Sequence, residues 1–232
     1  MAESRQSLLD VMRERLLHSQ GKAVSLHRIV FVAQSDTSLG NHSWEEIAGS
    51  YDKLFKSFNQ DTEPVSGLLL GFPGCCLHLI EAPTKVILSV ISDINSKVKE
   101  RILKDVKIIS SAEDIGPASF PGWFFRTIII ASQPDKVETD QSKISPLAIN
   151  CYLNFLKFGR KLSPLNKDEQ NTLLNNIRTG TYDLVPNATQ VMSLLGGTDI
   201  CTLADYESIF LRPIDIDLES ERVFPMKTSL KY

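Results

Sequence analysis

Two side chains that could act together in chemistry lie two residues apart in this sequence. Cys76 and His78 belong to the run CCLHLIEAP, which follows a Pro-Gly turn and predicts a β-strand. Residues i and i+2 of a strand share a face, so the thiol and the imidazole would point the same way. Their spacing along the strand is about 7 Å, too long for the direct hydrogen bond between a nucleophile and its base. The pattern therefore favours a packed thiol and a buried, hydrogen-bonded imidazole.

Metal binding is not indicated by the remaining candidates. His18, His27 and His42 are scattered, without a carboxylate or thiol at ligand spacing. Asp215 and Asp217 lack the glycine and the closing glutamate of a calcium loop. The four cysteines show neither disulfide-framework nor zinc spacing, which indicates core residues in a reducing compartment. We therefore expect no metal site.

Composition places the chain among soluble globular proteins. Of its 232 residues 42% are hydrophobic and 23% charged, and the net charge is −3 without a basic run. This balance argues against binding to nucleic acid or to an anionic membrane. No apolar stretch approaches the roughly 20 residues that span a bilayer, and the N-terminus does not resemble a secretory signal. We expect a cytoplasmic protein.

The segment 64–83, which contains Cys76 and His78, is the most informative part of the chain. Two apolar runs meet at Pro73-Gly74, which predicts a β-hairpin, and Pro83 marks the start of a helix. Alternation places Cys76, His78 and Ile80 on one face of the second strand. Both faces are largely apolar, so the hairpin is expected in the middle of a sheet that is covered on both sides, with His78 as the polar exception.

The elements that position this hairpin follow from the periodicity of apolar residues. Strands are expected at 25–33, 105–111 and 121–132, and helices at 3–19, 44–59 and 84–97. The helix at 3–19 is amphipathic, and a Ser43–Glu46 capping box begins the helix at 44–59. With the hairpin, the order from residue 25 is β-α-β-β-α-β-β. It predicts an α+β fold, a ferredoxin-like sandwich of one sheet and two helices with an extra strand.

The remaining segments extend this domain. We expect an N-terminal helix within 1–24, the α+β domain at 25–133, a polar linker at 134–144, a helical extension at 145–211 and an extended tail at 212–232. The broad apolar face of the helix expected at 145–160 suggests that it packs on the sheet face left open by the first two helices. A hydrolase on such a frame would need a phosphate-cradling loop with an arginine, and the turn at 34–37 has neither.

Four segments in this order resemble the BLUF domain, a flavin-binding blue-light sensor. They are the first strand at 28–33, the second at 65–70, the third strand with its helix start at 76–83, and the tryptophan-bearing run at 120–123. The resemblance spans roughly 25–132. It implies a flavin pocket at the positions of Phe31, Asn59, Gln60, His78 and Trp123.

The photosensory residues of that family differ in this chain. Phe31 stands where the family has a tyrosine that passes an electron and a proton to the flavin, and His78 stands where it has a switching glutamine. Asn59, beside Gln60, lies near the position of the asparagine that holds the flavin edge. We therefore expect a degenerate pocket without FAD and without the usual photochemistry. The alternative is a sensor that retains flavin or another small ligand in a modified pocket.

The whole layout resembles the testis-expressed protein 47 family, which has a degenerate BLUF domain with added ends. This resemblance implies a non-enzymatic structural part of the axoneme in cilia or the sperm flagellum, with axonemal or other cytoskeletal proteins as partners. The N-terminal helix and the C-terminal tail, with apolar residues spaced among charges, are the expected contact segments.

Overall fold

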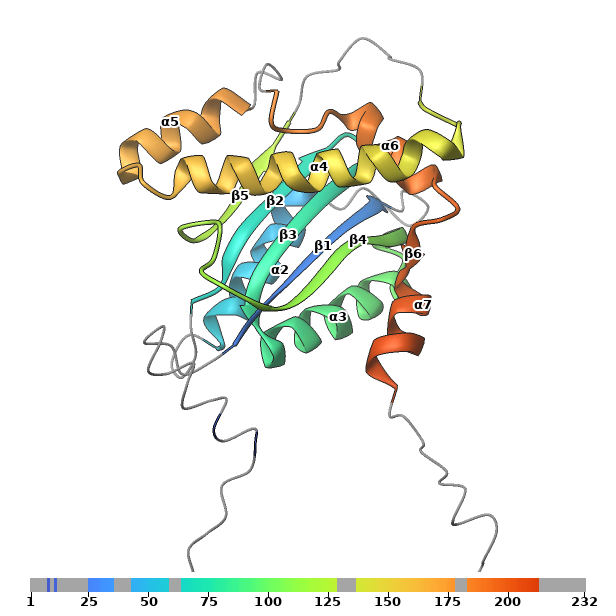
Figure 1. The fold of residues 1–232 in the computed structure, drawn as a ribbon, viewed down its shortest axis with the longest axis horizontal. Coiled ribbons are helices and arrows are strands. Elements are labelled where there is room, and N and C mark those ends of the chain that lie inside the picture. The colour runs from blue at the N-terminus through green and yellow to red at the C-terminus, as the bar shows by residue number, and fades with distance from the viewer. Residues whose placement is uncertain are drawn as a thin grey trace, which may run out of the picture.

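The apolar runs of the sequence form one six-stranded sheet in the computed structural model, which describes residues 8, 11, 25–35, 43–58, 64–128, 137–177 and 183–212 (Figure 1). The strands are β1 (Leu26–Ser35), β2 (Ser66–Phe72), β3 (Cys75–Pro83), β4 (Leu103–Ile115), β5 (Trp123–Thr127) and β6 (Cys201–Thr202). Strands β2 and β3 form the predicted hairpin around Gly74, whose φ of 81° is readily available to glycine.

The sheet has the order β5-β2-β3-β1-β4-β6. Neighbouring strands are antiparallel, except that β5 runs parallel to β2. Strand β3 lies between β1 and β2, and β1 lies between β3 and β4, so two split βαβ units interlock. This arrangement confirms the predicted ferredoxin-like sandwich with an extra strand. The two-residue strand β6 was not expected.

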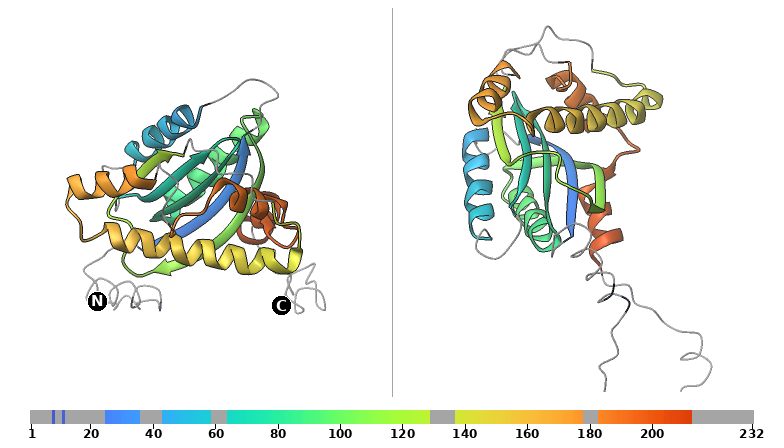
Figure 2. Two further views of the ribbon diagram at one scale, coloured as in Figure 1. Left: turned by 90° about the horizontal axis from the view of Figure 1, so that it is seen from above. Right: turned by 60° about the vertical axis from the view of Figure 1, so that its left-hand side comes forward.

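Helices α2 (Trp44–Lys56) and α3 (Thr84–Lys99) cover one face of the sheet (Figures 1 and 2). The predicted capping box of Ser43 and Glu46 begins α2. Side chains from α2 and α3 pack on the odd-numbered residues of β1, among them Ile29 and Phe31, to form a first hydrophobic core. Cys76 and Ile80 of β3 line the same core, on the shared face that the alternation predicted for them.

Helix α4 (Gln141–Leu162) lies across the opposite face, followed by α5 (Lys167–Ile177) and α6 (Ala188–Gly196) (Figure 2). Phe155 and Phe158 of α4 are buried with Val30 and Val32 of β1 in a second core, as predicted. However, α4 begins at 141 rather than 145, so the expected linker at 134–144 extends too far. The Asp140 side chain accepts a hydrogen bond from the backbone N–H of Ser142 and starts the helix inside that polar run.

Other element bounds also differ from the prediction. Strand β4 is longer than 105–111, because Asp105 and Asp114 adopt left-handed backbone conformations that let an irregular strand keep pairing with β1. The expected helical extension at 145–211 ends in a short α-helix, α7 (Leu203–Tyr206), that continues as the π-helical turn η1 (Glu207–Leu211). The expected helix at 3–19, apart from residues 8 and 11, the tail beyond 212, and residues 129–132 of the last expected strand lie outside the described residues. None of the helices in the described ranges is long and apolar enough to span a membrane.

Candidate functional site

The face of the sheet beneath α2 holds the candidate site. Antiparallel pairing of β1 with β3 sets Phe31 directly opposite His78. The indole of Trp123, from the parallel edge strand β5, reaches His78 from the other side, with Nε1 3.0 Å from the imidazole Nε2. The structure therefore brings Phe31, His78 and Trp123 together. Asn59 and Gln60 lie outside the described residues.

Helix α2 covers this group with two aromatic rings. The ring of Tyr51 packs at 4.8 Å, centroid to centroid, on His78, and Phe55 packs at 5.4 Å on Trp123. Phe31, on the neighbouring strand β1, lies 5.2 Å from His78 between ring centroids. We call these five side chains the aromatic cluster. His78 is fully buried and the Tyr51 side chain nearly so, which leaves no room for water beside them.

Hydrogen bonding fixes the proton of His78. An indole N–H can only donate, so the imidazole Nε2 that receives it must be the unprotonated nitrogen. The proton of the neutral ring then lies on Nδ1. Within the described part of the chain, neither this Nδ1–H nor the Tyr51 hydroxyl has a hydrogen-bond partner, although both are buried. Two polar atoms of the site are thus left unsatisfied, an arrangement that costs roughly 1–3 kcal/mol for each atom.

A buried cation lies next to the cluster. The ammonium of Lys97, on α3, sits 4.9 Å from the centroid of the Tyr51 ring and pairs with Asp93 one turn earlier. Burial, and then the Lys97 charge, lower the pKa of His78 to about 3, so the imidazole stays neutral. Burial, and then the Asp93 carboxylate, raise the pKa of Tyr51 well above its usual value.

The adjacent thiols are poor nucleophiles. Burial raises the pKa of Cys75 to about 12 and that of Cys76 well beyond its ordinary range. A thiol that stays protonated cannot serve as the attacking thiolate. In the described ranges, no group of three metal-ligating side chains lies close enough together to hold an ion. The chemistry that remains at this site is hydrogen bonding and aromatic packing.

A buried ion pair on the opposite face of the same strands holds the site together. Glu81 of β3 is fully buried, and its Oε1 accepts hydrogen bonds from Nε and Nη2 of Arg28 at 2.8 and 2.6 Å. Its Oε2 accepts from the Ser66 hydroxyl at 2.9 Å, and the backbone N–H groups of Ser119 and Phe120 also donate to this carboxylate. We call this group the Glu81 clamp.

The Glu81 clamp positions Trp123. It joins β1, β2 and β3 to the loop between β4 and β5, and Phe120 of that loop is buried against Phe155 of α4. Arg28 also reaches the Tyr152 hydroxyl on α4 at 3.2 Å. Because Trp123 follows Phe120 by three residues, the loop anchored by Glu81 sets where β5 begins and where the indole meets His78.

The described positions at which the resemblance implies a flavin pocket are occupied by the aromatic cluster, whose rings are in direct contact. The phenol that the first strand lacks at Phe31 is present instead on α2, as Tyr51. Helical periodicity places Tyr51 on the apolar stripe of the helix expected at 44–59, but it does not show that Tyr51 meets His78. Lys97 and Arg28 were likewise not recognised as part of the site, because charged side chains are seldom buried.

Fold and site together define a ferredoxin-like α+β protein whose sheet carries a closed aromatic cluster under its first helix. The sequence profile of the family described as Testis-expressed protein 47 matches residues 25–212, most of the chain. The chain therefore belongs to that family.

Among solved structures, this chain is similar to BLUF proteins. The structure titled BlrP1 BLUF is 14% identical, with 68% of this chain and 91% of that chain covered and a TM-score of 0.36. BlrB, titled a BLUF protein in its dark state, is 13% identical, with 68% and 98% covered and a TM-score of 0.35. Klebsiella pneumoniae BlrP1 with FMN and cyclic diGMP is 12% identical, with 44% of this chain and 26% of that chain covered and a TM-score of 0.37. This chain spans about a quarter of the full BlrP1 chain, and likeness at this level carries no function across.

Proposed function

We propose that this chain is a non-enzymatic interaction module built on a BLUF-like domain that has lost its photosensory residues. We further propose that it is a structural component of the axoneme in cilia or the sperm flagellum. The observation that carries the proposal is the closed aromatic cluster, in which Tyr51 and Trp123 pack against His78 where a ligand would otherwise lie. A site filled by its own side chains contributes to the stability of the fold.

The chemistry of the cluster supports the loss of photosensing. Phe31 has no hydroxyl from which an electron and a proton could pass to a ligand. The Nε2 atom of His78 already accepts a hydrogen bond from Trp123, so it is not available to reorganise around a carbonyl. Burial of the thiols as protonated groups supports the non-enzymatic part of the proposal.

The axonemal setting rests on the family resemblance. A cytoplasmic protein of the cytoskeleton with a rigid folded middle would contact its axonemal partners through segments outside the sandwich. The N-terminal helix expected within 1–24 and the tail at 212–232 carry apolar residues among charges and are the proposed contact segments.

An absorbance spectrum of the purified protein tests the loss of photosensing. We expect no flavin band in the blue and no change on illumination. Addition of FAD or FMN should leave the melting temperature unchanged, since only a ligand that binds the folded state raises it. A yellow preparation with a light-dependent shift would overturn this part of the proposal.

Localisation tests the structural role. A tagged full-length chain expressed in sperm or ciliated cells is expected along the axoneme, and removal of 1–20 together with 212–232 should release it into the cytoplasm. A full-length chain that stays diffuse in these cells would contradict the axonemal role. If the truncated chain stays on the axoneme, the two ends are not the anchors.

One observation favours a second candidate, a small-ligand sensor. The Nδ1–H of His78 and the Tyr51 hydroxyl are buried without hydrogen-bond partners in the described structure. Polar groups of a ligand-binding site are in this state when the ligand is not bound. A ligand carrying a hydrogen-bond acceptor could satisfy both if α2 moved outward. Where the ligand is a flavin, addition of FAD or FMN separates the two candidates, because a flavin sensor would show a raised melting temperature and the interaction module would not.

A further inference from the structure

The outward face of α4 carries apolar side chains in solvent. Ile149 is 58% exposed and Leu153 is 45% exposed, and the two are neighbours on the helix surface at i and i+4. Pro146 precedes them on the same face, and the exposed Lys157 and Arg160 continue it toward the C-terminal end. We call these five residues the α4 ridge. The opposite side of α4 packs on the second core, so the ridge points away from the fold.

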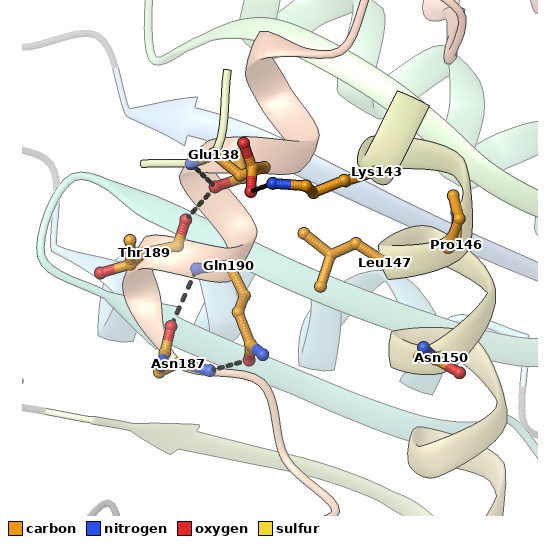
Figure 3. A pocket seen from close by; sticks show the side chains of 9 residues that line it. Glu138, Lys143, Pro146, Leu147, Asn150, Asn187, Thr189 and Gln190 are labelled. Atoms are coloured by element: carbon orange, nitrogen blue, oxygen red, sulfur yellow. Dashed lines mark hydrogen bonds and ion pairs between the residues drawn. The ribbon is translucent and has the colours of Figure 1, made fainter. Parts of the chain in front are cut away.

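A groove runs along one side of this ridge, between α4 and α6 (Figure 3). Its volume is about 340 Å³, and its walls include Pro146, Leu147 and Asn150 of α4, with Asn187 and Gln190 at the start of α6. The ion pair of Glu138 and Lys143 closes one end, so Lys143 already has an acidic partner there. The side-chain oxygens of Asn187 and Gln190 are engaged in the capping box of α6, which leaves their NH₂ groups to donate to a guest. Leu153 lies one turn beyond Asn150, so the ridge and the groove form one continuous surface.

Charge along α4 is one-sided. The helix contains four basic residues and no acidic residue, in a chain whose net charge is −3. Lys157, Arg160 and Lys161 gather at its C-terminal end, beyond the apolar part of the α4 ridge. From the N-terminal toward the C-terminal end of α4, a partner that lies along the ridge would therefore contact apolar side chains and then positively charged ones.

We propose that the α4 ridge and the α4–α6 groove bind an acidic amphipathic helix of a partner protein. The apolar stripe of the partner helix covers Ile149 and Leu153, and its carboxylates face Lys157 and Arg160. A side chain at the edge of that stripe enters the groove beside Leu147. The inference rests on the proposed function as an interaction module and assigns to it a contact surface within the folded part of the chain. A lipid bilayer is the less suitable occupant, because an amide-walled groove offers specific hydrogen bonds that a membrane surface does not use.

The test uses full-length protein and a fluorescent synthetic helix with leucines at i, i+3, i+4 and i+7 and glutamates beside them. Fluorescence anisotropy should show binding. Ile149→Ser/Leu153→Ser should weaken the affinity by roughly tenfold or more, since apolar anchors carry much of such an interface. Lys157→Glu/Arg160→Glu should weaken it to a similar extent or more, and the affinity should no longer fall as salt is added. All four side chains are exposed, so the two double variants should fold, which circular dichroism checks.

Matched controls come from α3. Leu88 is 45% exposed, like Leu153, and Val98 is 37% exposed, so Leu88→Ser/Val98→Ser removes similar apolar surface from another helix and should bind as the unchanged protein does. Lys85→Glu/Lys99→Glu is the corresponding charge control. A peptide with lysines in place of the glutamates should bind at least tenfold more weakly.

Three outcomes would overturn the proposal. One is equal binding by the ridge variants and the unchanged protein. Another is that a peptide of residues 213–232 binds more tightly than the synthetic helix and displaces it, which would make the chain's own tail the occupant. The third is ridge-dependent binding to phosphatidylserine vesicles without binding to the helix. The first and third outcomes do not bear on the anchoring ends, because the ridge variants retain 1–24 and 212–232. The second would give the tail a contact within its own chain, and the localisation experiment scores both ends separately.

Discussion

The Tyr51 hydroxyl is the most direct probe of the candidate site at the scale of single residues. It is buried without a hydrogen-bond partner in the described structure, so Tyr51→Phe removes an uncompensated polar atom while the ring keeps its packing on His78. We expect the free energy of unfolding to stay constant or to rise by about 1 kcal/mol. Urea denaturation followed by tryptophan fluorescence measures it.

Tyr206 provides the matched control for this substitution. It is also buried, but its hydroxyl lies 2.9 Å from that of Ser111, so Tyr206→Phe should lower the stability by about 1 kcal/mol. If Tyr51→Phe proves the more destabilising of the two, the Tyr51 hydroxyl has a hydrogen-bond partner in the folded protein, and the unsatisfied group that favours the ligand-sensor candidate is lost.

His78 should make the stability depend on pH. Its pKa falls from the ordinary 6.5 to about 3 in the folded protein, so the unfolded chain binds the proton more tightly. The stability that a neutral His78 contributes is complete above the unfolded pKa and is lost as the pH falls from 6.5 toward 3. Between about pH 7.5 and pH 5, we expect wild type to lose about 2 kcal/mol more than His78→Phe does.

The comparison with His78→Phe isolates this residue, because every other titrating group is shared. Urea denaturation at each pH gives the two stability curves, and His78→Gln serves in the same way if the larger ring folds poorly. Curves that stay parallel down to about pH 5 would mean that the imidazole binds its proton equally well in both states. The groups that face it, Lys97 and Tyr51, would then have to be closer to water than the structure places them.

Part of the site could be predicted at the residue scale. Strand alternation and the family resemblance together placed Phe31, His78 and Trp123 at one site, and the pairing of β1 with β3 brings the first two face to face. Tyr51 and Lys97 could not be assigned to it. Which turn of α2 or α3 meets a given strand residue depends on how the helix docks, and helical periodicity defines only the inward stripe.

The Glu81 clamp belongs to the scale of elements, because it joins three strands to a loop and to α4. Glu81→Gln keeps the shape but leaves Arg28 as a buried charge without its counter-ion. Loss of one partner from a buried pair typically costs about 3–5 kcal/mol, and we expect a loss of that size in urea denaturation.

A double-mutant cycle with Arg28→Met gives the coupling between the two side chains. The double variant should be more stable than Glu81→Gln alone, because it leaves no unpaired buried charge. Strictly additive losses would show that the ion pair contributes no coupling. In that case Trp123 would be positioned by the packing of Phe120 on α4 and not by the carboxylate.

The elements themselves were predictable where one local signal dominates. The Pro73-Gly74 turn specified the β2–β3 hairpin, and the Ser43 capping box specified the start of α2. Strand β6 and the π-helical turn η1 were not foreseen. Two residues carry no alternation, and β6 exists because Cys201 and Thr202 meet the outer edge of β4 at Ile108 and Lys107. Contacts between distant segments therefore decide the elements for which local sequence gives no signal.

At the scale of the whole molecule, the sheet separates two hydrophobic cores, and we expect the folded state to require both. The first lies under α2 and α3, and the second is closed by α4, α5 and α6. Strands β2 and β3 are buried along their entire length, as expected for strands covered on both sides. The segments 25–133 and 145–211 both contribute side chains to the second core, and the family match at 25–212 spans both.

This architecture predicts that the α+β segment alone will not form a stable soluble protein. A fragment of residues 25–136 would expose the side chains of Val30, Leu68, Leu77 and Leu79, which α4 and α6 cover in the intact chain. An exposed apolar sheet face of this kind promotes association. We expect this fragment to aggregate or to bind the dye ANS strongly, whereas residues 25–212 should elute as a discrete species and unfold in one cooperative transition. Size-exclusion chromatography and thermal denaturation distinguish these outcomes. Cooperative unfolding of 25–136 as a soluble monomer would show that the helical layer is an accessory, and α4 would then be free to leave the sheet when a partner binds.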